Sequence, residues 1–273
     1  MLTTTTKNTT TTTTITTMKM FDTHTHYDDE IFDGDRDDVI CSLASAGVSH
    51  VLNASYDLKS SEASRELSAR YGFIWRAAGI HPHNAAGAPP GYEKALEHLL
   101  SGDKAVALGE IGLDYHYDFS PRDVQREVFE KQLTLACKLG VPVIIHEREA
   151  NEDVLDILRA CRGALRGGVY HCFMGDRGLA ARVLELGFHI AFGGALTFKK
   201  SDHIADAAAY APSDRILLET DCPYMSPAPF RGKRNDSTRL ALIAERAAQI
   251  RKIDIDEIAE ITTENAKRLF MIP

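Results

Sequence analysis

The amino-acid sequence predicts an α/β fold, a single-domain (β/α)8 barrel of the TIM type. Three observations predict it: the chain has 273 residues, eight short β-rich runs recur along it, and amphipathic stretches of helical length separate most of them. Barrels of roughly 250 residues form one domain, and parallel strands need crossover connections such as helices. An open doubly wound sheet is the alternative. Because no GxGxxG motif follows the first strand, a dinucleotide site has no support.

The predicted strands are short apolar runs, and the predicted helices carry apolar residues at three- and four-residue steps. The strands are expected at 18–23, 48–54, 73–79, 105–109, 141–145, 168–170, 189–192 and 215–218. The clearest helix is 121–139, where Pro121 suits the first turn and Gly140 suits the position just past the end. Residues 151–161, 176–186 and 237–250 show the same helical pattern.

The first seventeen residues differ from the rest, because twelve of them are Thr. A Thr tract without apolar partners cannot offset its ordering entropy, so we expect a disordered extension at 1–17 and a single barrel domain at 18–273. No apolar run approaches 18 residues, which excludes a membrane-spanning helix. The net charge of −8 argues against a broad basic face. Five scattered Cys residues without a CxxC pair favour a reducing, cytoplasmic location.

Polar residues gather where the predicted strands end. In a barrel the carboxyl ends of the strands converge on one mouth, where active sites are built. Six groups from five strands would therefore meet, namely His24, His26, Glu110, His146, His171 and Asp221. Each residue alone has an ordinary structural explanation as a core histidine or an ion-pair partner. The set, however, needs cations to offset the burial of its carboxylates.

The six groups predict a divalent-metal site. His24 and His26 are two residues apart, which places both imidazoles on one face of a strand. A mixed set of nitrogen and oxygen donors suits Zn, Mn, Fe or Ni, and six ligands are too many for one tetrahedral ion. We therefore expect two divalent metal ions (Mg, Mn or Zn) that share Glu110. From strand order, His24, His26 and Asp221 would hold one ion, and His146 and His171 the other. Asp221 is also the candidate general base.

The loop after the last strand favours phosphate as the ligand. It carries three cations within four residues, Arg231, Lys233 and Arg234, and the loops after strands seven and eight often bind phosphate in barrels. Tyr224 and Phe230 are candidates to stack on a base. His81, after strand three, is a candidate contact for phosphate or a substrate oxygen. The alternatives are a solvated basic loop and a structural histidine. Lys199 and Lys200 follow strand seven and would add to the same side of the mouth.

Six motifs, taken in order, resemble the signatures of the TatD family of metal-dependent deoxyribonucleases, and the likeness covers residues 18–271. The resemblance implies a barrel of the amidohydrolase superfamily, divalent metals and cytosolic 3′–5′ exonuclease activity on DNA. It places the family's metal ligands on the same six residues, with Glu110 and Asp221 as the catalytic carboxylates. The motifs are Phe21-Asp-Thr-His-Thr-His26, Gly79-Ile-His-Pro-His83, Gly109-Glu-Ile-Gly-Leu-Asp-Tyr115, Val143-Ile-Ile-His146, Tyr170-His-Cys-Phe173 and Leu218-Glu-Thr-Asp-Cys-Pro-Tyr224.

Three departures from the family pattern bear on substrate preference. Glu147 stands where the family has Ser, Met174 where it has Ser, and Asp236-Ser237 where it has Glu-Pro. The extra carboxylate of Glu147 near the mouth is expected to weaken phosphate binding.

The sequence thus predicts a deoxyribonuclease that hydrolyses single-stranded DNA or 3′ ends by attack of a metal-activated water, as a monomer. The alternative is an acyl hydrolase acting on a small amide, a lactone or a D-aminoacyl-tRNA ester. A third possibility is a metal-bound binding protein, against which the complete ligand set argues.

Overall fold

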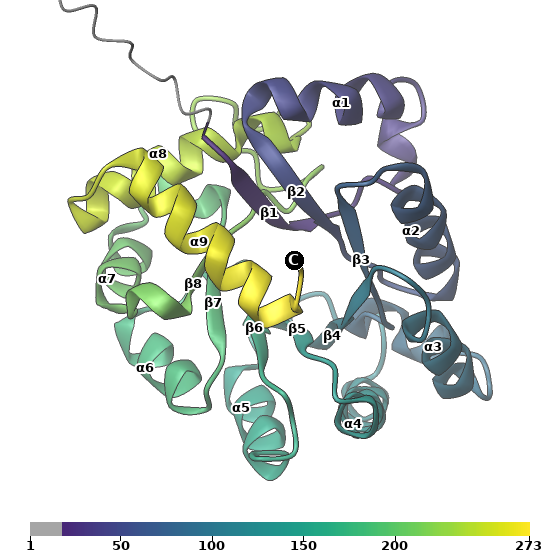
Figure 1. The fold of residues 1–273 in the computed structure, drawn as a ribbon. Coiled ribbons are helices and arrows are strands. Elements are labelled where there is room, and N and C mark those ends of the chain that lie inside the picture. Colours follow the sequence, from purple (N-terminus) through teal and green to yellow (C-terminus); the bar gives the residue numbers. More distant parts are fainter. Residues whose placement is uncertain (1–17) are drawn as a thin grey trace, which may run out of the picture.

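The computed structural model describes residues 18–273, and the predicted Thr-rich extension at 1–17 lies outside them. Eight parallel strands form one sheet in the order β1 to β8, with the helices around its outside (Figure 1). The predicted (β/α)8 barrel is therefore confirmed. The strands are β1 Met20–Thr25, β2 Val48–Asn53, β3 Ile74–Ala78, β4 Ala105–Asp114, β5 Val143–Arg148, β6 Gly168–Tyr170, β7 His189–Phe192 and β8 Ile216–Leu218.

Nine α-helices cover the described part of the chain, and several begin and end at the residues that the sequence favours. Pro121 lies at the N-cap rather than in the first turn of α4, and Gly140 ends that helix with a φ of 66°. The helices are α1 Arg36–Ser42, α2 Leu58–Arg70, α3 Tyr92–Leu100, α4 Arg122–Leu139, α5 Asn151–Ala160, α6 Arg177–Glu185, α7 Asp202–Tyr210, α8 Leu240–Arg251 and α9 Ile255–Phe270. Between residues 18 and 273, no helix combines the length and apolarity needed to cross a bilayer.

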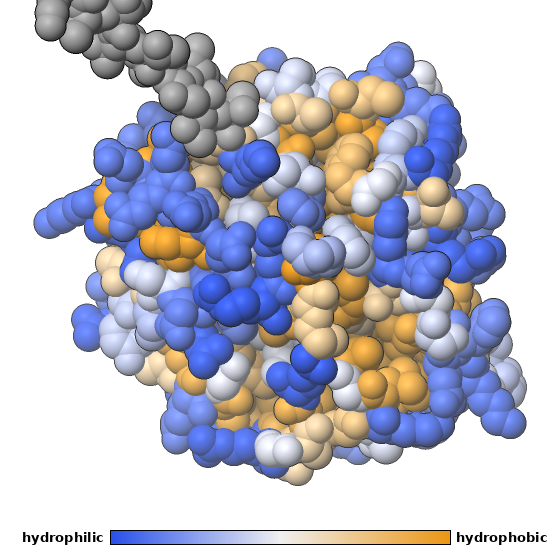
Figure 2. Space-filling view, in the orientation of Figure 1, coloured by the Kyte–Doolittle hydropathy of each residue, from blue (hydrophilic) through white to orange (hydrophobic). Residues whose placement is uncertain are grey.

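The core has two layers, because strand residues alternate between the barrel interior and the helices. Leu52, Ala77 and Ile144 belong to the inner cluster, and Leu269 and Phe270 of α9 pack against it. Helix α9, drawn in yellow, crosses the near end of the barrel (Figure 1). From this side, hydrophilic side chains cover most of the outer helices (Figure 2). Helix α9 thus closes the end opposite the carboxyl ends of the strands and leaves that other end for a site.

Side-chain and backbone bonds join β1 to the segment after β8. Asp22 accepts hydrogen bonds from the backbone N–H of Thr220 at 2.8 Å and from its hydroxyl at 2.6 Å. The N–H of His26 donates to the carbonyl of Cys222 at 2.8 Å, and that of Asp221 donates to the carbonyl of His24 at 3.0 Å. These bonds fix the segments that carry two histidines and one carboxylate of the site against each other.

Four predicted elements have boundaries that are wrong by two residues or more, and the others differ by one residue at most. β1 runs from Met20 to Thr25 instead of 18–23, and β4 continues past Gly109 to Asp114. β5 extends to Arg148, because residues 111–114 pair with residues 145–148. The pairing overrides the turn signal of the two glycines in Gly-Glu-Ile-Gly. The predicted helix 237–250 is divided into a 3-10 turn, Ser237–Arg239, and α8.

Candidate metal centre

The six side chains singled out from the sequence meet at the carboxyl end of the barrel. They come from β1, β4, β5, β6 and β8 or from the residues that closely follow these strands, and Glu110 and His146 lie within the extended β4 and β5. Glu110 lies at the centre, is only 4% exposed, and points its two carboxylate oxygens at different partners. Oε2 faces His24 and His26, and Oε1 faces His146 and His171.

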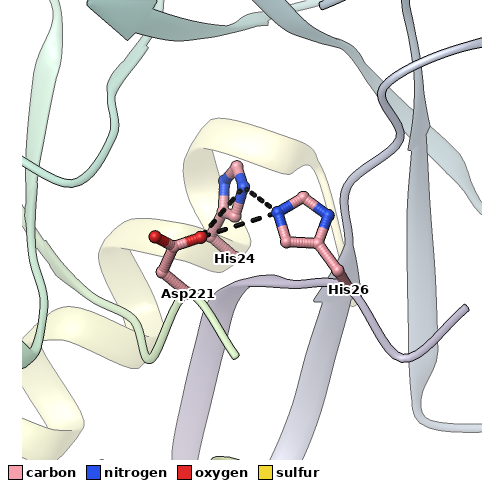
Figure 3. A group of neighbouring side chains, drawn as sticks. All are labelled: His24, His26 and Asp221. Carbon is pink, nitrogen blue, oxygen red and sulfur yellow. Dashed lines mark hydrogen bonds and ion pairs between the residues drawn. The ribbon is translucent and has the colours of Figure 1, made fainter. Parts of the chain in front are cut away.

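The first group consists of His24, His26 and Asp221 (Figure 3). The two Nε2 atoms are 3.2 Å apart, and Asp221 Oδ1 lies 3.9 Å from that of His24 and 3.5 Å from that of His26. Oε2 of Glu110 lies 3.3 Å and 3.8 Å from the same two nitrogens. Asp221 lies three residues after the end of β8 and has a φ of 57°, and its carboxylate faces His24 of β1 and His26 just after it.

These separations fit donors that share one ion. Ligands roughly 2.0–2.2 Å from a tetrahedral Zn²⁺ lie roughly 3.3–3.6 Å apart. The Nε2 atoms of His24 and His26 are only 3.2 Å apart. At this distance two nitrogen lone pairs repel each other unless a proton or a cation lies between them. The donor set consists of two imidazoles, which can bind a metal when neutral, and two carboxylates. This set therefore suits a divalent cation.

The second group lies on the other side of Glu110. His146 Nδ1 and His171 Nε2 are each 2.7 Å from Glu110 Oε1, and these two nitrogens are 3.4 Å apart. The 2.7 Å contacts are hydrogen bonds, in which each ring donates to the carboxylate. A cation would take the place of those protons, because metal binding requires deprotonated ligands.

For two of the rings, His26 and His146, a hydrogen bond on the far side decides which nitrogen is available to the site. His26 Nδ1 donates to the carbonyl of Ala54 at 3.2 Å, so Nε2 faces the cluster. His146 Nε2 lies 3.2 Å from Asp114 Oδ2, so its Nδ1 faces Glu110. Such outer partners orient metal-binding histidines and raise their basicity.

His81 is placed differently. Its Nδ1 accepts the backbone N–H of His83 at 3.1 Å, so the neutral ring carries its proton on Nε2. That Nε2 lies 3.5 Å from Glu110 Oε1. Burial, with help from the neighbouring His146, lowers the pKa of His81 to about 3. His81 therefore presents a neutral N–H donor to the site and does not have a free lone pair there.

Charge in the cluster is balanced by protons on imidazoles. Burial opposes ionisation of Glu110, but the surrounding imidazoles, above all that of His171, outweigh it and hold the pKa of Glu110 well below the usual value. Burial likewise opposes a charged His171, yet Glu110 and Glu219 hold its pKa well above the usual value. The pKa of His26 is raised to about 9 against burial, by Asp221 and Glu110. Positive charge is thus favoured next to both oxygens of Glu110.

Two carboxylates to which the sequence analysis assigned no role, Asp114 and Glu219, contact histidines of the site on the side away from Glu110. Asp114 accepts a hydrogen bond from His83 Nε2 at 2.8 Å as well as contacting His146. Burial alone would raise the pKa of Asp114, but these hydrogen bonds outweigh burial and lower it. Glu219 is fully buried, accepts the backbone N–H of Cys172, and lies 3.5 Å from His171 Nδ1. Asp114 lies four residues after Glu110 on the same strand, and this even spacing was the available signal.

The site opens into a pocket of about 690 Å³ that is lined by aromatic and histidine rings together with Arg148. Arg231, Lys233 and Arg234 are not among its lining residues. Arg234 instead forms a two-pronged ion pair with Asp35, at 2.6 and 2.7 Å. Arg231 lies over the ring of Phe198 and Lys233 over that of Phe230, and both are exposed. Of the predicted substrate contacts, His81 lines the pocket, and so does the stacking candidate Tyr224.

The departure at Glu147 also has a structural explanation. Its Oε1 accepts the backbone N–H of Ala150 at 2.7 Å, just before α5 begins. Burial raises the pKa of Glu147. Its carboxyl group is therefore engaged with the backbone beside the pocket.

The chain is similar to known proteins over almost its whole length. The family described as TatD related DNase matches residues 21–271. The uncharacterized metal-dependent hydrolase YabD of Bacillus subtilis is 40% identical, covering 93% of this chain and 99% of YabD. The 3′-5′ ssDNA/RNA exonuclease TatD of Salmonella typhimurium is 32% identical, covering 93% and 99%. The crystal structure of YJJV, a TatD homologue from Escherichia coli K12, superposes with a TM-score of 0.88 at 30% identity, covering 93% and 98%. The chain therefore belongs to the TatD-related DNase family and is a metal-dependent hydrolase.

Proposed function

We propose that the centre holds two divalent ions bridged by Glu110. His24, His26 and Asp221 would hold one ion with Oε2 of Glu110, and His146 and His171 the other with Oε1. The observation that carries this proposal is the opposed use of the two Glu110 oxygens, each facing two imidazoles. The imidazole-rich donor set favours Zn²⁺ or Mn²⁺ over Mg²⁺.

The residues of the chain have separable tasks in hydrolysis of a phosphodiester. Bound divalent ions would clamp the phosphate and lower the pKa of a water toward neutrality. Asp221, within 3.5–3.9 Å of both β1 histidines, is positioned to accept the proton of the attacking water. His81 would donate its Nε2 proton in a hydrogen bond to a phosphate oxygen. Asp114 and Glu219 would hold His146 and His171 in their orientations.

We infer that the substrate is single-stranded DNA, shortened from its 3′ end. The family description and the name of the Salmonella relative support this class of substrate. The pocket supports it as well, because its histidine and aromatic lining suits a nucleotide more than a small amide. The exposed Arg231 and Lys233 lie outside the pocket and would meet phosphates further along the strand.

We also propose that the enzyme acts in the cytoplasm and as a monomer. All five cysteines are free thiols, which suits a reducing compartment. The six groups of the centre come from a single copy of the chain, so a second copy is not needed to complete the site.

The test is digestion of 5′-labelled single-stranded DNA by the chelated enzyme, resupplied with Mg²⁺, Mn²⁺ or Zn²⁺. We expect a ladder that shortens from the 3′ end, no cleavage with chelator, and no cleavage by Glu110→Ala or His146→Ala, each with an unchanged circular dichroism spectrum. His98→Ala, an exposed histidine on α3, is the matched control and should cleave normally.

Cleavage by Glu110→Ala at the wild-type rate would contradict the metal centre. An enzyme that leaves DNA intact with every metal, yet hydrolyses a lactone, a small amide or a D-aminoacyl-tRNA ester, would instead establish the acyl-hydrolase alternative.

A further inference from the structure

Two aromatic side chains stand exposed beside the metal centre. Tyr117 is 46% exposed and Phe119 is 68% exposed, and both lie in the loop between β4 and α4. Their rings are stacked, with centroids 5.2 Å apart and an angle of 22° between the planes. We call these two residues the aromatic shelf. Large apolar rings at the surface are informative where they are contiguous and border a site.

The aromatic shelf forms part of the pocket wall and is tied to the centre. The backbone N–H of Tyr117 donates to Asp114 Oδ1 at 2.8 Å, and Asp114 Oδ2 contacts His146. The ring of His83, also bound to Asp114, meets Phe119 edge-on with centroids 4.8 Å apart. The backbone and His83 thus fix the position of the shelf, whereas both of its rings remain exposed.

A cation lies next to the aromatic shelf. The guanidinium of Arg148 lies 4.7 Å from the centroid of Tyr117. Within residues 18–273, no carboxylate comes within ion-pair distance of Arg148. Among the described residues lining this pocket, Arg148 is also the only Arg or Lys. Its charge is therefore available to an anionic ligand in the pocket.

An exposed aromatic ring next to an Arg is not by itself unusual in this chain. Tyr210, at the end of α7, is 40% exposed, and Arg177 lies 4.5 Å from its ring centroid. Tyr210, however, stands alone and is not a pocket residue. The aromatic shelf differs because two stacked rings, an uncommitted cation and the candidate metal ligands share one wall.

We propose that the aromatic shelf binds an unpaired nucleobase next to the scissile phosphate, while Arg148 meets a flanking phosphate. This inference rests on the proposed function and specifies its substrate. Every base has a π-face, so stacking is tolerant of sequence, but it requires a base that is not already stacked and paired in a duplex. The shelf therefore selects single-stranded ends regardless of base identity.

The test compares Phe119→Ala and Tyr117→Ala with wild type on two substrates. One is a single-stranded oligonucleotide, and the other is the same oligonucleotide with an abasic residue at its 3′ end. We expect each variant to raise KM for the normal oligonucleotide on the order of 10-fold with little change in kcat. KM for the abasic substrate should stay at the wild-type value. Phe119→Trp should keep the wild-type KM, and the control Tyr210→Ala should change neither substrate.

Binding without turnover supplies a second measurement. The chelated enzyme is titrated with an oligonucleotide carrying 2-aminopurine at its 3′ end, whose fluorescence changes on stacking. Phe119→Ala should weaken this binding by the same order as it raises KM. Two results would overturn the role of the shelf but not the nuclease activity. One is that the variants raise KM equally for the normal and the abasic oligonucleotide. The other is that the wild type cleaves DNA and the variants leave both KM and binding unchanged. A wild type that binds 2-aminopurine DNA through Phe119 but never cleaves it would overturn the nuclease and leave the shelf intact.

Discussion

Replacing Gly112 by Ala should damage stability and activity together, because this residue lies where β4 and β5 bring the centre together. Gly112 pairs with His146 and has a φ of 148°. A Cβ at this position would lie 1.9 Å from the carbonyl oxygen of His146, whereas real Cβ contacts under 3.0 Å are essentially never seen. The obstructing atom is backbone, so no side-chain rotation relieves the clash, and the strands must separate by about 1 Å.

The two costs can be put in numbers. Holding an L-residue in a sparsely populated backbone region costs about 1–3 kcal/mol. Forcing extra volume into a packed interior costs a further 1–3 kcal/mol or so, which makes a total of about 4 kcal/mol. A displacement of about 1 Å between Glu110 and His146 should also lower kcat about 100-fold, because catalytic groups tolerate little misplacement.

Gly167→Ala is a control that separates the two costs. Gly167 has a φ of 114°, but nothing lies within 4 Å of its added Cβ. It should lose only the backbone cost, about 1–3 kcal/mol, and keep its activity. The measurements are urea unfolding and DNA cleavage for both variants. If Gly112→Ala is no less stable than Gly167→Ala, or cleaves DNA at the wild-type rate, the reasoning about the β4–β5 contact is refuted.

Three further predictions concern other parts of the chain. Asp114→Asn should weaken metal affinity by about 10- to 100-fold, because it disturbs the orientation of His146. A titration of the chelated enzyme with metal, with activity as the signal, measures this affinity. An unchanged affinity would contradict the supporting role of Asp114. Burial lowers the pKa of His189 to about 4, so the folded protein, unlike the unfolded chain with a pKa of 6.5, resists protonation as pH falls from 6.5 to 4. Between pH 7 and pH 5 the free energy of unfolding of His189→Gln should therefore fall by about 2 kcal/mol less than that of the wild type, as measured by urea unfolding. The same fall in both proteins would be the contrary result. Neutralising Arg231 and Lys233 should weaken binding of long oligonucleotides and flatten its salt dependence by about one unit of slope each, while binding of dinucleotides stays unchanged.

The architecture and the position of the centre could be predicted because they depend on rules that act along the whole chain. Alternation of strands and helices specifies a parallel barrel, and a barrel brings all strand ends to one mouth. His24, Glu110 and Asp221 therefore had to lie close together although they are far apart in sequence. The boundary of β4 could not be predicted in the same way, since its extension to Asp114 depends on pairing with β5.

The basic loop has a contact that its own sequence does not predict. Three cations within four residues predict a phosphate site, but Arg234 is bound to Asp35, a residue of the distant α1 region. Nothing in the loop itself encodes that partner. The proposed stacking role of Phe119 could not be predicted from the sequence either. An aromatic residue in a loop indicates a binding surface only when its exposure and its neighbours are known.

The central proposal is that two divalent ions would be held at this centre, with Glu110 as a ligand to both. The most direct measurement is the number of ions per chain, determined by elemental analysis of the enzyme after chelation, resupply with Zn²⁺ or Mn²⁺, and gel filtration, in parallel with DNA cleavage by the same samples. We expect two ions per chain in the wild type, a loss of ions in Glu110→Ala, and cleavage that rises with the ion content. A chelated enzyme that holds no ions and still cleaves DNA at the full rate would contradict the claim.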